Sequence, residues 1–135
     1  MTRVLLIDGD RALAQSVAMV CIEDGMAVRL AETLCEGVRY MVDGPVTVVL
    51  INADLMRLPG PEQARVFDAV APGVPVVALV REGASVEETV KLEEQGFQVV
   101  AKPFDLRDTL AKVELPARSL PARPGAAARV EALCG

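Results

Sequence analysis

Five short runs of apolar residues recur along the chain, and each is followed by a segment with helical spacing. The runs are four to six residues long and rich in Val, Leu and Ile, which favours strands over fragments of helix. Several are apolar almost throughout, as is typical of strands covered on both faces. The pattern predicts strands over residues 4–7, 27–30, 46–51, 76–80 and 98–101.

The segments between these runs carry helix signals at their ends. Asp10 stands where an N-cap is expected, and Gly25 ends the pattern that follows it. Proline followed by glutamate suits the first turn of a helix, as at Pro61 and Glu62. The predicted helices follow Asp10, span about residues 32–42, begin at Pro61, span about residues 84–96 and follow Asp105.

Strands that alternate with helices imply right-handed crossovers and a parallel sheet with helices on both faces. Five such units within residues 1–114 predict an α/β fold, a flavodoxin-like, doubly wound five-stranded parallel sheet of the (βα)5 type. Ligands of such sheets bind beyond the carboxyl ends of the strands. The polar residues predicted at these ends are Asp8, Asp10, Asn52, Asp54, Arg81 and Lys102.

Composition narrows the possible functions. The chain has 135 residues, enough for one domain, and contains no histidine, which removes imidazole as a metal ligand, general base or phosphocarrier. The net charge of −5 argues against direct binding to nucleic acid or to an anionic membrane. No apolar run is long enough to span a bilayer, and the N-terminus lacks a secretory signal pattern. These features predict a cytoplasmic protein.

The cysteines and the C-terminal residues complete the sequence-based picture. Cys21, Cys35 and Cys134 are odd in number, widely spaced and without a C-x-x-C pattern, which predicts reduced packing thiols and no disulfide framework. Residues 115–135 are rich in Pro, Ala and Arg and are predicted to form a flexible tail or linker, with room for a short helix over residues 125–133. The arginines of this segment, Arg118, Arg123 and Arg129, are too few to predict nucleic-acid binding.

The residues at the strand ends resemble those of a known family. Leu-Leu-Ile-Asp-Gly-Asp at residues 5–10, the apolar run at 75–80 and Val-Ala-Lys-Pro-Phe at 100–104 are similar to the receiver (CheY-like) domain of bacterial two-component response regulators. The resemblance covers about residues 2–114, and Gly60 falls at a glycine position of the family. It implies phosphoryl transfer from a histidine kinase to an aspartate at the end of the third strand, with Mg²⁺ held by an acidic pair.

Carried over residue by residue, the resemblance implies a degenerate site. Asp8 and Lys102 are retained, but the second acidic position holds Gly9 and the phosphoacceptor position holds Asn52. An amide is a far weaker nucleophile than a carboxylate. The hydroxyl and aromatic positions hold Val80 and Val99. With only Asp8 and Asp10 as residual carboxylates, Mg²⁺ binding is expected to be weak or absent, and no other cofactor is expected.

The leading hypothesis is a pseudo-receiver that is not an enzyme and acts in phosphorelay signalling as a phosphorylation-independent protein interaction module. The resemblance places its partner surface, or a homodimer contact, over about residues 84–114, without direct nucleic-acid or membrane binding. A shifted loop that makes Asp54 the phosphoacceptor is one alternative. A flavodoxin-like nucleotide- or flavin-binding protein is another, although the acidic loop at residues 8–11 and the scarcity of aromatic residues oppose it. The plain structural interpretation is an Asp8–Lys102 ion pair and an Asn52 side chain that ties its own loop.

Overall fold

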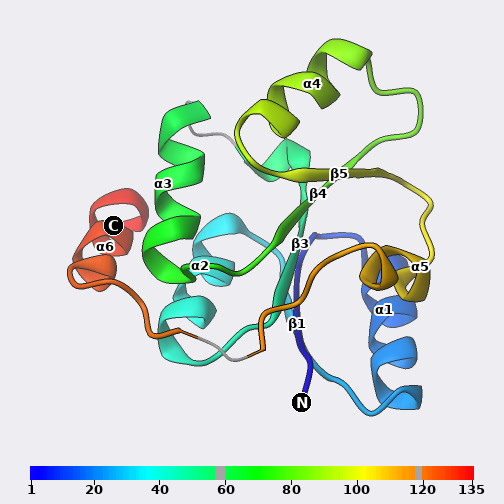
Figure 1. The fold of residues 1–135 in the computed structure, drawn as a ribbon, viewed down its shortest axis with the longest axis horizontal. Coiled ribbons are helices and arrows are strands. Elements are labelled where there is room, and N and C mark those ends of the chain that lie inside the picture. The colour runs from blue at the N-terminus through cyan, green and yellow to red at the C-terminus, as the bar shows by residue number, and fades with distance from the viewer. Residues whose placement is uncertain (57–59, 118–119) are drawn as a thin grey trace.

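A computed structural model of the chain describes residues 1–56, 60–117 and 120–135. Its centre is a five-stranded parallel sheet with the strand order β2-β1-β3-β4-β5 (Figure 1). This arrangement confirms the predicted flavodoxin-like, doubly wound fold. The strands are β1 (Arg3–Ile7), β2 (Ala27–Ala31), β3 (Val48–Asn52), β4 (Val76–Val80) and β5 (Gln98–Ala101).

Helices connect the strands at the predicted places. A short 3₁₀ helix, η1 (Ala53–Leu55), follows β3 directly. None of the helices in the described part of the chain is long and apolar enough to cross a membrane. The α-helices are α1 (Arg11–Glu23), α2 (Leu34–Asp43), α3 (Gly60–Val70), α4 (Val86–Glu94), α5 (Leu106–Ala111) and α6 (Ala126–Cys134).

Side-chain caps fix where four of these helices begin. Each cap is an extended residue whose side-chain oxygen accepts the backbone N–H three residues further on, a bond that satisfies one of the otherwise unpaired amides of the first turn. The predicted cap Asp10 accepts from Leu13 in this way at 3.1 Å. The caps of α1, α2, α4 and α5 are Asp10, Thr33, Ser85 and Asp105.

Alternation along the strands divides the core into two layers. One face of the sheet packs against α1 and α5, and the other packs against α2 and α3 (Figure 1). The sheet is therefore covered on both sides, as the apolar strands predict. The residues of β1 and β3 on the α1 side are Val4, Leu6, Val48 and Leu50, and those on the α2 side are Leu5, Ile7, Val49 and Ile51.

An arginine fork fastens α5 to the end of α1. The Arg107 Nε donates to Asp24 Oδ2 at 2.8 Å, and its Nη2 donates to Asp24 Oδ1 at 3.0 Å and to Glu23 Oε2 at 2.9 Å. The hydrogen bonds from Arg107 hold the pKa of the Asp24 carboxyl below its usual value. Such bidentate pairs fix orientation as well as distance. They position α5, which has only six residues.

The C-terminal segment differs from its sequence-based description. A disulfide joins Cys35 to Cys134, so the prediction of reduced thiols is wrong for these two residues, while Cys21 is a buried free thiol. The physical reason is that α6 folds back against α2 and α3, which brings the two Cα atoms to 5.7 Å. The segment predicted as a flexible tail thus carries a packed helix close to the predicted range 125–133. Arg118 lies outside the described residues.

Gly37 of α2 is required by its close approach to β1. A Cβ at this position would overlap the buried Ile7 side chain, whose Cγ1 would lie only 2.6 Å away. We expect Gly37→Ala to lower the free energy of unfolding by about 1–3 kcal/mol, because overpacking a filled core forces neighbours off their preferred positions. Urea unfolding measures this change. Gly44→Ala is the control, since a Cβ there meets no atom within 4 Å, and an equal loss in both variants would contradict the packing argument.

Candidate functional site

A buried ion pair lies where the first and fifth strands end. Asp8 follows β1, its side chain is only 2% exposed, and the Lys102 Nζ lies 2.6 Å from its Oδ2. Lys102 follows β5 and is 25% exposed along its side chain. Asp8 Oδ2 accepts no other hydrogen bond within the described part of the chain, so the Lys102 ammonium is the group that satisfies this oxygen. The predicted proximity of Asp8 and Lys102 is present.

The end of β3 brings Asn52 to the same place. Ile7 of β1 pairs with Ile51 of β3. The residues that follow them, Asp8 and Asn52, are therefore neighbours at the end of the sheet. The Asn52 Nδ2 donates to Asp8 Oδ1 over 3.4 Å, a long and therefore weak hydrogen bond. Its Oδ1 accepts the backbone N–H of Asp54 at 3.0 Å. Asn52 therefore ties its loop and turns its amide hydrogens toward Asp8.

Asp54 lies beyond the strand end, in η1. Its side chain is exposed, and β3 pairs with β4 up to Asn52 opposite Leu79. The shift of the loop that would make Asp54 the residue beside Asp8 is not present in this register.

The remaining candidate positions offer no polar side chain. Val80 is 5% exposed at the end of β4, and Val99 is half-buried in β5. Gly9 follows Asp8 with open space around it, because a Cβ there would meet no atom within 4 Å. The backbone of this site therefore has room for a second carboxylate that the sequence does not supply.

The donor set does not fit the Mg²⁺ that the family resemblance implies. Mg²⁺ needs near-octahedral oxygen ligands. Asp8 Oδ1 accepts the Asp10 backbone N–H at 3.0 Å, and its Oδ2 is held by Lys102. Asp10 uses its carboxylate to cap α1. Nowhere among the described residues do three acidic or cysteine side chains gather as a metal site would require.

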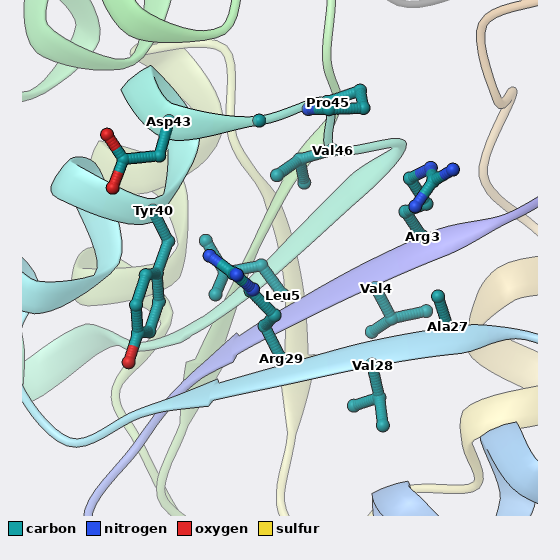
Figure 2. Close-up of a pocket in the computed structure, with 11 residues that line it drawn as sticks. Arg3, Val4, Leu5, Ala27, Val28, Arg29, Tyr40, Asp43, Pro45 and Val46 are labelled. Carbon is teal, nitrogen blue, oxygen red and sulfur yellow. The ribbon is translucent and has the colours of Figure 1, made fainter.

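Among the cavities in the described part of the chain, two lie at opposite ends of the sheet. One of them, of about 500 Å³, adjoins Lys102 beyond the strand ends. It is lined by acidic and basic side chains, among them Asp10, Arg81 and Glu82. The other, of about 260 Å³, lies over the amino-terminal halves of β1 and β2, with Arg3, Arg29 and Tyr40 around it (Figure 2). The Arg29 guanidinium stacks 4.7 Å from the centre of the Tyr40 ring. The Tyr40 hydroxyl donates to Glu36, and this bond raises the pKa of the phenol. Nothing in the sequence pattern pointed to this second cavity.

The architecture and the strand-end residues define a doubly wound α/β domain with a charged cluster at the carboxyl ends of its strands. The chain belongs to the response regulator receiver domain family, whose sequence profile matches residues 4–114. Members of this family generally act in signal transduction and not as enzymes. The match favours the receiver hypothesis over the nucleotide- or flavin-binding alternative.

Individual relatives agree with this assignment. Over 111 residues the chain is 25% identical to the response regulator MprA of Mycobacterium sp. (strain KMS), a match that covers 82% of this chain and 48% of that protein. It is 29% identical over 103 residues to the transcriptional regulatory protein GlrR of Escherichia coli (strain K12), covering 76% and 23% respectively. The chain thus spans half or less of the length of these relatives.

Solved structures show the same fold. A response regulator receiver domain protein (CheY-like) from Methanospirillum hungatei JF-1 is 26% identical, with a TM-score of 0.70 over 83% of this chain and 90% of that one. The beryllofluoride-activated NtrC4 receiver domain dimer, at 22% identity, has a TM-score of 0.70 over 82% and 92%. The second likeness concerns the fold alone.

Breaking the buried ion pair from the lysine side is expected to destabilise the domain. Lys102→Met leaves the Asp8 carboxylate buried without its counter-charge. We expect the free energy of unfolding to fall by about 3 kcal/mol. This is the low end of the range for a buried ion pair, because the lysine is partly exposed. Denaturant unfolding measures the loss.

Two companion variants test whether the unpaired Asp8 charge causes this loss of stability. Adding Asp8→Asn to Lys102→Met removes the stranded charge and is expected to recover at least half of the loss. Arg81→Met breaks the exposed Arg81–Glu88 pair of 3.1 Å and is expected to cost below about 1 kcal/mol. No recovery in the double variant would refute the role assigned to the ion pair.

Proposed function

We propose that this receiver domain signals by binding a protein partner and does not depend on phosphorylation. The observation that supports the proposal most directly is Asn52 beside Asp8 at the end of β3, with its amide hydrogens directed at that carboxylate. An amide oxygen in this position gives no stable acyl phosphate. The side chain is already engaged on both sides, by Asp8 and by the backbone of Asp54.

The side chains that would couple a phosphoryl group to the rest of the domain are also aliphatic. By resemblance to the family, a hydroxyl at the end of β4 and an aromatic residue in β5 respond to the phosphoryl group. Val80 and Val99 hold these places, and neither has a donor to offer. A ligand shifts a conformational equilibrium only through different interactions with the two states. The domain therefore works as a platform whose shape its binding partner selects.

The proposed binding surface comprises α4, β5 and α5, about residues 84–114. None of the residues of α4 is buried, and Val86 and Val90 are 78% and 42% exposed. The helix is acidic, with Glu87 and Glu88 in its first turn and Glu93 and Glu94 in its last. Exposed valines framed by carboxylates suit a protein partner or a second copy of the domain, and disfavour nucleic acid or an anionic membrane. We place this activity in the cytoplasm.

Chemical inertness toward phosphoryl donors is the first test. Incubation of the domain with Mg²⁺ and acetyl phosphate is expected to add no phosphoryl mass, because the acceptor carboxylate and the second acidic ligand are both missing. Intact-protein mass spectrometry reads the outcome, with a phosphorylatable receiver domain treated in parallel. A stoichiometric adduct that disappears in Asp54→Ala would overturn the proposal and assign Asp54 as the acceptor.

Repair of the site is the second test. Gly9→Asp with Asn52→Asp supplies two carboxylates where open space and a strand end already exist, so we expect saturable Mg²⁺ binding in the double variant. Because Val80 and Val99 remain, beryllofluoride should shift backbone amide NMR signals only near residues 8–10, 52–54 and 102. Shifts that spread through residues 84–114 would show an intact switch and contradict the platform proposal. The single variant Gly9→Asp, which lacks an acceptor, is the control.

A further inference from the structure

The α6 helix lies beyond the residues that the family profile matches. The family match ends at residue 114, and α6 lies on the outside of α2 and α3, away from the sheet (Figure 1). Two of its residues, Ala126 and Val130, are buried there, and Cys134 in its last turn is partly buried. The helix thus covers part of the outer face of α2 and α3.

Apart from the packing of Ala126 and Val130, few hydrogen bonds or ion pairs among the described residues hold this helix in place. It has nine residues, fewer than the roughly 12–15 that an isolated helix needs, and its N-cap Gly125 supplies no side-chain bond. The segment before it is anchored by the Arg123 backbone N–H on the Ala69 carbonyl at 2.8 Å. The Arg123–Asp68 ion pair is more than half exposed on both sides and contributes little.

The disulfide acts at the opposite end of the helix from these anchors. Cys35 lies in the first turn of α2 and Cys134 is the last residue of α6, 99 positions later in the chain. It is the covalent tie that keeps the final turn of α6 on α2. Both cysteines are partly exposed, whereas Cys21 is buried.

We propose that the Cys35–Cys134 disulfide is a reversible thiol-redox site whose reduction by a dithiol releases α6 from α2. The first thiolate of the dithiol attacks one sulfur, the S–S bond breaks, and the other cysteine leaves as a thiolate. The second thiolate of the reductant then attacks the reductant's own sulfur in the mixed disulfide, which breaks that S–S bond and releases the remaining cysteine as a thiolate. Two electrons pass from the dithiol, which becomes a disulfide, and the two cysteines end as thiols after taking up two protons.

The proposal goes beyond the function proposed above and does not depend on the chemistry of Asn52. It draws support from the cytoplasmic location we assign, because protein disulfides there are mostly redox-sensing or transient. Cys21 stays outside the exchange: it is fully buried, and burial, with the nearby Asp24 charge, raises the pKa of its thiol. Release of α6 bares the apolar α2–α3 face that Ala126 and Val130 cover.

The test compares the full chain before and after treatment with dithiothreitol under native conditions. Maleimide labelling with mass spectrometry is expected to add no label to the oxidised chain and two labels, at Cys35 and Cys134, after reduction. Hydrogen exchange of the α6 amides is expected to accelerate by at least about tenfold, while the amides of β1 and β3 keep their protection. Re-oxidation should restore the slow exchange.

Matched variants test whether the Cys35–Cys134 disulfide is the cause of slow exchange in α6. Cys35→Ser/Cys134→Ser should show fast α6 exchange without any reductant, and Cys21→Ser should keep the full redox response. Unchanged α6 exchange after complete reduction would overturn the proposal, as would a disulfide that is reduced only once the domain is unfolded. Neither outcome bears on the phosphorylation tests, so the two proposals fail separately.

Discussion

The ion pair between Asp8 and Lys102 is the constraint on which the strand-end region depends. Burying a carboxylate that is only 2% exposed is costly without a counter-charge. The ammonium that supplies this charge follows the edge strand β5, which β3 and β4 separate from β1. The ends of four strands must therefore stay in register for the charge to be compensated. Asn52 fits this arrangement because its amide adds a donor toward Asp8, where an aspartate would add a second negative charge.

The two faces of the sheet are secured by different means. On the α1 side, Leu106 and Val113 are buried in one cluster with residues of α1, and the exposed fork from Arg107 to Asp24 and Glu23 joins the end of α1 to the short α5. On the α2 side, helix packing comes so close that only Gly37 fits against Ile7, and a disulfide lies further out. Exposed ion pairs respond to salt, whereas close packing and a covalent bond do not. Ionic strength therefore acts on α5 more than on α2.

Much of the fold could be predicted from the residues themselves. Runs such as residues 76–80 are too short and too apolar for amphipathic helices, and Asp10 and Asp105 have the side chains that cap helices. The neighbourhood of Asp8, Asn52 and Lys102 also followed, because parallel strands end at one edge. The disulfide did not follow, because the spacing of Cys35 and Cys134 carries no information on where a proline-rich segment returns. The hydrogen bond by which Asn52 ties its own loop was predicted as well, whereas the direction of its amide hydrogens toward Asp8 was not.

The position of the disulfide has a practical consequence for any shortened form of this protein. A fragment cut at residue 114, where the family match ends, loses Cys134 and keeps Cys35 with no partner. That half-buried thiol, no longer covered by α6, is then open to air oxidation and to coupling with the same residue of another fragment. Dimers of such a fragment would then be linked by a disulfide between two unpaired Cys35 residues, and they would not be evidence for association through α4 and α5. Association measurements therefore call for the chain with both cysteines, or with neither.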